Sequence, residues 1–138
     1  MDADGQHLPA EIPLLLKEAT KGESDMIIGN RMGDPHGMPW DRRFTNRIMS
    51  WLLSRIAGQH VPDTQCGFRA ISRRALESIQ LTSERFEIES ELVLRCARAG
   101  LRIASVPISS VYRHQTSFIR PFRDTLRFLR LLRQTRGG

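Results

Sequence analysis

Residues 25–31, DMIIGNR, hold the short apolar run that decides the fold. A methionine and two isoleucines follow one another without the alternation of a half-exposed strand, and the run ends in Gly-Asn. An apolar run of this length that leads into a turn is typical of a strand buried on both faces. We therefore expect a buried strand here, followed by the Gly- and Pro-rich loop MGDPHGMPWD at 32–41.

Helical patterns lie on both sides of this strand. Residues 8–21, LPAEIPLLLKEATK, hold helix formers before the stop signal Gly22, which predicts a helix with Pro13 in its first turn. Residues 42–57 predict an amphipathic helix that ends at Gly58. Arginines lie mostly away from its apolar residues, which fall near one helical face: Phe44, Ile48, Trp51, Leu52 and Ile56.

The second half of the chain continues the alternation of strands and helices. CGFRAIS at 66–72 alternates as a strand does, and RRALESI at 73–79 predicts a short helix. Residues 86–99 predict a helix that ends at Gly100. LRIASVPI at 101–108 predicts a strand whose proline favours an edge or a terminus. This order of elements is typical of an α/β sheet with crossovers.

The last twenty-one residues, 118–138, differ in kind. The stretch FIRPFRDTLRFLRLLRQTR places apolar and arginine residues on separate stripes, which predicts a basic amphipathic helix. Such a helix can lie at the surface of an anionic membrane, dock on the domain, or bind nucleic acid. Nucleic acid is not expected as a partner, because the sequence shows no cluster of exposed aromatic residues for base stacking.

The chain has 138 residues, of which 40% are hydrophobic. This length and composition are typical of an ordinary globular domain. The net charge is +6, and of the twenty-one basic residues only Lys17 and Lys21 are lysines. Arginine suits phosphorylated ligands and anionic surfaces, although a solvated arginine face is the alternative. No apolar run approaches the roughly 20 residues that span a bilayer. Cys66 and Cys96 fit no metal-ligand spacing, so we expect two free thiols in a reduced setting.

A pair of carboxylates stands at the start of the chain, in MDADGQH. Asp2 and Asp4 are two residues apart, so on an extended stretch both side chains project to the same side. Two such carboxylates can hold Mg²⁺ or Mn²⁺, which would recruit a diphosphate. The alternative is an N-cap or a solvated turn. His7, close to Pro9, is typical of a turn rather than of a metal site.

Further charged candidates lie beside glycine-containing segments. Arg31 ends the 25–31 stretch and Arg69 lies in GFR, where backbone can approach a ligand closely. For Arg69 a surface charge at a strand edge is the alternative. Asp63 precedes GFR in a turn-like stretch. Glutamates at 87, 89 and 91 cluster at a helix start, where placement at the positive end of the helix dipole is the alternative to a functional role.

Together the motifs DADGQH, GNR, DTQCGFR and FEIE resemble, in order and spacing, the second half of a family 2 glycosyltransferase. The branch resembled is that of dolichyl-phosphate mannosyltransferases and polyprenyl-phosphate glycosyltransferases. The resemblance covers residues 1–117 and implies a partial GT-A fold, an α/β sandwich, with the tail helix at 118–138 outside it. It implies an inverting transfer of sugar from a nucleotide diphosphate sugar to a polyprenyl phosphate or another membrane-borne acceptor.

The resemblance also implies roles for particular residues. Metal binding, of Mg²⁺ or Mn²⁺, is implied for Asp2 and Asp4. Substrate binding is implied for one amide and four guanidinium groups: Gln6, Arg31, Arg43, Arg47 and Arg69. Active-site roles are implied for two further carboxylates, Asp63 and Glu89. A phosphate acceptor is already an anion at neutral pH, so these carboxylates would orient it, whereas an alcohol acceptor would need a base.

Family members carry a nucleotide-binding half upstream of the paired carboxylates. From the usual domain size, we expect about 80–100 residues of such a half upstream of the stretch that begins at Met1. We therefore expect a fragment, or one half of an enzyme whose N-terminal half is a separate chain. We expect a cytoplasmic, peripheral position at the inner face of the membrane, with residues 119–136 on its anionic surface. The alternative is a non-catalytic module that binds an anionic surface, either membrane or nucleic acid.

Overall fold

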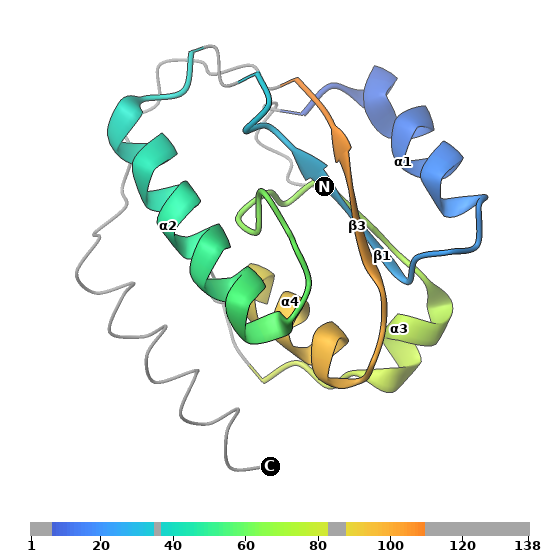
Figure 1. The fold of residues 1–138 in the computed structure, drawn as a ribbon. Helices are drawn as coiled ribbons and strands as arrows, with labels where there is room; N and C mark the ends of the chain where they lie inside the picture. The colour runs from blue at the N-terminus through green and yellow to red at the C-terminus, as the bar shows by residue number, and fades with distance from the viewer. Residues whose placement is uncertain (1–6, 35–36, 83–87, 110–138) are drawn as a thin grey trace.

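The computed structural model describes residues 7–34, 37–82 and 88–109 (Figure 1). Helices and strands alternate along these residues, which confirms the α/β class and is consistent with part of a larger domain. The elements in chain order are η1 (Pro9–Glu11), α1 (Ile12–Ala19), β1 (Met26–Asn30), α2 (Trp40–Ala57), β2 (Arg69–Ile71), α3 (Arg73–Ser78), α4 (Ile88–Arg98) and β3 (Ile103–Pro107).

β1 is the middle strand of a three-stranded sheet with the order β2-β1-β3. It pairs antiparallel with β2, with Ile28 opposite Arg69, and parallel with β3, with Asn30 opposite Pro107. The first four residues of β1 are all buried, so both faces of the strand are covered. The buried strand expected at 25–31 is therefore confirmed. β3 forms an edge of the described sheet and ends at its proline, as the sequence predicted.

The helix expected at 8–21 is divided in two. A 3₁₀ turn, η1, comes first, and Pro13 lies in the first turn of α1, where its missing amide costs no helical hydrogen bond. The carboxylate of Glu11, in η1, accepts hydrogen bonds from the amide and the hydroxyl of Ser109 at 2.7 and 2.6 Å. These bonds tie the start of the described chain to the segment that leaves β3.

Helices cover the sheet from two sides. α1 lies against all three strands, α4 packs on β3, and α2 packs on α4. Figure 1 shows α1 and α2 on opposite sides of the sheet. The core between these layers consists of buried side chains from the sheet, the helices and the loops: Leu15, Met26, Ile27, Ile28, Val61, Cys66, Phe68, Ala75, Leu92, Val93, Cys96, Leu101, Val106 and Ile108.

The amphipathic helix expected at 42–57 is present as α2, which ends at Gly58 in the left-handed conformation. Its inward side is mixed: Asn46 and Ser50 are buried together with Leu53, and Met49 and Leu52 pack in one apolar cluster with Leu53 and with Leu94 of α4. Its large apolar side chains point outward: Trp40, Phe44, Ile48 and Trp51 are exposed by 81%, 61%, 47% and 65%. The expectation that exposed aromatic residues do not cluster is therefore wrong.

Two serines explain this orientation of α2. The hydroxyl of Ser50 accepts a hydrogen bond from the amide of Thr64 at 2.9 Å. The hydroxyl of Ser54 accepts from the amide of Val61 at 2.9 Å and donates to its carbonyl at 3.1 Å. Val61 and Thr64 are fully buried, so their backbone groups need partners inside the protein. α2 supplies these partners, and the same rotation of the helix leaves Trp40, Phe44, Ile48 and Trp51 facing outward.

Within the ranges that the structure describes, no helix is both long and apolar enough to cross a membrane. The predicted tail helix at 118–138, and the domain boundary predicted before it, lie outside the described residues.

Candidate functional site

A buried ion pair joins the end of β1 to the loop that follows α2. Arg31 donates from Nε to Asp63 Oδ2 at 2.7 Å and from Nη2 to Asp63 Oδ1 at 2.9 Å. The backbone amide of Arg31 also donates to Asp63 Oδ2 at 3.1 Å. The two side chains are only 3% and 0% exposed. Both carboxylate oxygens of Asp63 are thus engaged by Arg31, an arrangement that fixes the position of both groups.

Arg69, at the start of β2, binds three backbone carbonyls. Its guanidinium donates to the carbonyls of Cys66 at 2.8 Å, Glu89 at 2.9 Å and Thr64 at 2.7 Å. Burial lowers the pKa of Arg69, and the carboxylate of Glu89 opposes that change. The side chain therefore links the DTQCGFR segment to the first turn of α4, which carries Glu89.

These contacts bring four of the predicted site residues into one connected cluster. Asp63 lies one residue before Thr64, whose carbonyl binds Arg69, so the loop connects the Arg31 pair to the Arg69 contacts. Glu89 is half-buried at the far end of this network. The network fixes the positions of β1, β2, the loop and α4 relative to one another.

The two cysteines are buried free thiols, as expected. Burial raises the pKa of Cys66 to about 11, with a further contribution from Asp63, while Arg31 and Arg69 oppose the rise. Burial likewise raises the pKa of Cys96 to about 11. In both residues burial thus favours the protonated thiol over the thiolate.

His7 is buried and stacks on Phe68, with ring centroids 5.1 Å apart and planes 12° from parallel. The contact places the start of the described chain beside the GFR segment, a position that the prediction of a turn residue did not foresee. The metal candidates Asp2 and Asp4, and the adjacent Gln6, lie outside the described residues. Elsewhere, in 7–34, 37–82 and 88–109, no group of three or more His, Cys, Asp or Glu residues could hold a metal ion.

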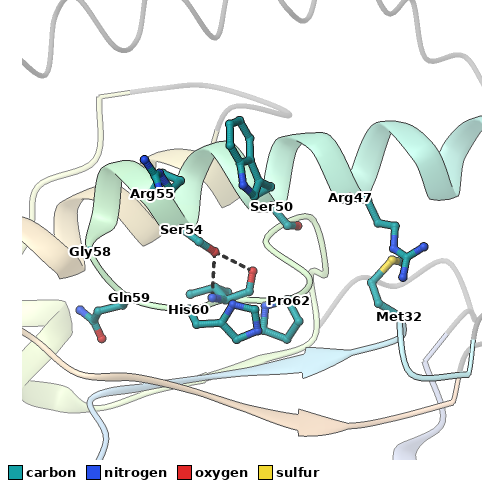
Figure 2. Close-up of a pocket in the computed structure, with 11 residues that line it drawn as sticks. Met32, Arg47, Ser50, Ser54, Arg55, Gly58, Gln59, His60 and Pro62 are labelled. Carbon is teal, nitrogen blue, oxygen red and sulfur yellow. Dashed lines mark hydrogen bonds between the residues drawn. The ribbon is translucent and has the colours of Figure 1, made fainter.

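An open groove of about 820 Å³ runs between α2 and the loop after it (Figure 2). α2 contributes Arg47, Ser50, Trp51, Ser54 and Arg55, and the other wall consists of residues 58–62 together with Met32, which directly follows Arg31. Figure 2 shows the hydrogen bonds that join Ser54 of α2 to the loop, with Arg47 extending toward Met32.

The charges of the groove define what it can bind. Among the described residues that line it, Arg47, Arg55 and His60 carry basic groups and none is acidic. An anion would therefore be favoured there, and arginine is suited to phosphate oxygens. Of the two α2 arginines predicted to bind substrate, Arg47 lines this groove, whereas Arg43 is exposed on α2 and does not.

Sequence reasoning missed several residues of this region. Ser50 and Ser54 are spaced to share one helical face, and that spacing was the available signal, but only the fold shows which loop they hold. For Glu91 in α4 the sequence left open a functional role or a helix-dipole charge, and it gave no partner for the side chain. It is fully buried and accepts hydrogen bonds from the amide of Thr82 at 3.1 Å and its hydroxyl at 2.8 Å, and it pairs with Arg95.

Comparison with known families decides the family of the chain. The model of the family described as Glycosyl transferase family 2 matches residues 1–80. The chain belongs to this family. The match covers three of the four quoted motifs, DADGQH, GNR and DTQCGFR, and the recognition from these motifs is confirmed.

Curated relatives place the chain more closely within family 2. It is 36% identical to the undecaprenyl-phosphate mannosyltransferase of Micrococcus luteus, over 82% of this chain and 48% of that protein. It is 33% identical to the UDP-N-acetylglucosamine–dolichyl-phosphate N-acetylglucosaminyltransferase of Methanococcus voltae, over 80% and 46%. It is 31% identical to the polyprenol monophosphomannose synthase of Mycolicibacterium smegmatis, over 79% and 43%. The chain spans about half the length of these relatives.

Proposed function

We propose that this chain is part of a family 2 enzyme that transfers a sugar from a nucleotide diphosphate sugar to a polyprenyl phosphate. The observation that carries the proposal is the cationic groove beside the Arg31–Asp63 pair. Arg47, Arg55 and His60 offer basic groups to the phosphate of the acceptor. The names of the three relatives support the acceptor class, since each refers to a dolichyl, undecaprenyl or polyprenol phosphate substrate or product.

In the reaction that we propose, an oxygen of the acceptor phosphate attacks the anomeric carbon of the sugar. A new C–O bond forms as the bond from that carbon to the diphosphate breaks, and the diphosphate leaves with the electron pair. Attack from the opposite face inverts the anomeric configuration. The attacking phosphate is already an anion, so no strong base is required.

The residues of the cluster then act by position. Both oxygens of Asp63 already bind Arg31, so we assign Asp63 the task of fixing Arg31 beside the groove rather than that of removing a proton. Arg69 holds the backbone of this loop and of Glu89. Glu89 is proposed to orient the acceptor side. Arg43 and Arg47 are proposed as the cationic groups that meet the acceptor.

A divalent cation, Mg²⁺ or Mn²⁺, is proposed for the donor diphosphate. The described residues do not provide its site. The paired carboxylates Asp2 and Asp4 have the oxygen ligands that such ions prefer, and Gln6 follows them in the chain. When bound, the cation would neutralise charge on the leaving diphosphate.

Calorimetry on the full 138-residue chain tests the acceptor site with a short analogue, farnesyl phosphate, and its uncharged counterpart farnesol. We expect binding of the phosphate only, and binding about tenfold weaker in Arg47→Gln, because one charge-assisted hydrogen bond is lost. Arg73→Gln on α3 is the matched control, an exposed arginine away from the groove. Equal binding of farnesol, or an unchanged Arg47→Gln variant, would contradict the acceptor assignment.

A second function, a non-catalytic module for anionic surfaces, is favoured by the net charge of +6 and by the exposed arginines of α2. Titration with UDP- and GDP-sugars in the presence of Mn²⁺ separates the two functions. Binding that requires Mn²⁺ and is lost in Asp4→Ala supports the enzyme. No donor binding in any combination, with acceptor phosphate still bound, supports the module. Residues 119–136 and the inner membrane face are proposed as the place where either function operates.

A further inference from the structure

The outward side of α2 is an apolar stripe with arginines along it. At 100° per residue, Trp40, Phe44, Ile48 and Trp51 fall within an arc of about 80°. All four are exposed, and the Arg55 guanidinium lies 6.0 Å from the centroid of the Trp51 ring. We call these four residues, with Arg43, Arg47 and Arg55 beside them, the α2 face. Single exposed apolar residues are common, but a continuous stripe of large ones marks a contact surface.

Rotation of α2 about its axis cannot bury the apolar residues of the α2 face. Ser50 and Ser54, on the neighbouring side of the helix, hold the buried backbone of residues 61–64. Turning the stripe inward would break those hydrogen bonds and leave buried amides unpaired, at a cost for each. The exposure of the stripe is therefore fixed by the fold.

We propose that the α2 face lies on an anionic lipid surface, with its rings at the level of the headgroups. Tryptophan is favoured at the boundary between headgroups and acyl chains, and arginine is attracted to anionic headgroups while its stem covers apolar surface. α2 carries four arginines and one aspartate, so its charge complements an anionic bilayer.

Other occupants fit this charge less well. A second copy of the chain would set arginines against arginines, and so would the arginine-rich residues 118–138. A nucleic-acid strand usually stacks successive bases on aromatic rings, whereas Ile48 interrupts the rings of this stripe.

The inference deepens the proposed function. It rests on that function at one point, namely that the acceptor is membrane-borne. Arg47, Trp51 and Arg55 belong both to the α2 face and to the lining of the groove. When the α2 face lies on the bilayer, the mouth of the groove is therefore at the depth of the lipid phosphates. A polyprenyl phosphate could then reach the groove from the membrane with its chain still among the lipids.

The two tryptophans of the chain, Trp40 and Trp51, both lie on the α2 face, so intrinsic fluorescence reports on this face alone. The full chain is titrated with vesicles of phosphatidylcholine and phosphatidylglycerol, and with vesicles of phosphatidylcholine only. We expect the emission to shift to shorter wavelength with the anionic vesicles, and to be quenched when the lipids carry bromine on the upper acyl chain.

The test variant is the double substitution Phe44→Glu with Ile48→Glu, which leaves both reporters and the tail intact. It should bind anionic vesicles at least tenfold more weakly, because two apolar contacts are lost and two negative charges are added. The matched control on α1 is Ile12→Glu with Leu16→Glu, exposed residues at the same spacing on the side of the sheet away from α2. It adds the same charge and should bind far better than the test variant. Circular dichroism checks that both variants are folded.

Several results would overturn the inference. Unchanged binding of a folded test variant would assign membrane contact to another part of the chain. If that variant does not fold, bromine quenching of the wild-type protein decides the question. Wild-type binding to anionic vesicles without quenching by brominated lipid would place the tryptophans away from the lipid. A concentration-dependent shift without vesicles indicates a second copy, and a shift only with single-stranded oligonucleotide indicates nucleic acid. The readout involves no sugar donor and no transfer, so it can fail while the proposed function holds, and the reverse.

Discussion

Asp63→Ala tests how strongly the buried ion pair holds the site together. The substitution removes the carboxylate that accepts three hydrogen bonds from Arg31, at 2.7, 2.9 and 3.1 Å. Removing one partner of a buried pair costs about 3–5 kcal/mol, because the other charge stays in a low-dielectric interior. Small domains are stable by only about 5–15 kcal/mol, so the loss is a large share of the total.

Urea unfolding followed by circular dichroism measures this change in the free energy of unfolding. Glu77→Ala is the matched control, because it also removes a carboxylate from a 2.7 Å pair, with Arg73, but on an exposed helix surface. We expect the control to change the free energy of unfolding by less than about 1 kcal/mol. If Asp63→Ala is no more damaging than this control, the buried pair does not organise the site and the reasoning is refuted.

Four further predictions concern neighbouring contacts and the two buried thiols. Arg69→Lys should lower the free energy of unfolding by about 2–4 kcal/mol in the same urea assay, because an ammonium group cannot reach all three carbonyls in the planar geometry of the fork; a neutral result would mean that the carbonyl contacts are dispensable. Ser54→Ala should cost about 1–3 kcal/mol, since the buried amide of Val61 loses its acceptor, and an unchanged urea midpoint would contradict the account of the α2 orientation. The pKa of Cys66 and that of Cys96, each raised by burial from 9.0 to about 11, should make thiol alkylation at pH 8 at least a hundredfold slower in the native protein than in urea. Because the raised pKa favours the folded state only while the thiols are protonated, their contribution to stability should be complete below pH 9 and lost as the pH rises through about 11. Rapid native alkylation at pH 8 would show that the thiols are accessible and ionised.

The elements of the fold could be predicted because their signals are local. The apolar run at 25–31 predicted β1, Gly58 and Gly100 predicted helix ends, and the proline at 107 predicted the end of an edge strand. The motifs predicted the family for the same reason, since their order along the chain requires no knowledge of contacts.

The site could be predicted only in part. The sequence offered Arg31, Asp63, Arg69 and Glu89 as candidates. Their hydrogen-bond partners lie up to 32 positions away in the chain, so the sequence could not show which residues pair. Arg31 was predicted to bind substrate, and the fold shows its guanidinium paired with Asp63. A motif names the residues that gather at a site, whereas hydrogen-bond geometry decides which of them are already engaged.

The sequence by itself determined that residues 42–57 form an amphipathic helix, because the periodicity of its apolar and polar residues is a property of the chain alone. Only the tertiary structure decided which side of that helix faces the core. The loop after α2 buries backbone amides that need acceptors, and Ser50 and Ser54 supply them. The side that carries these serines faces inward together with Leu53, and the tryptophans were left on the surface.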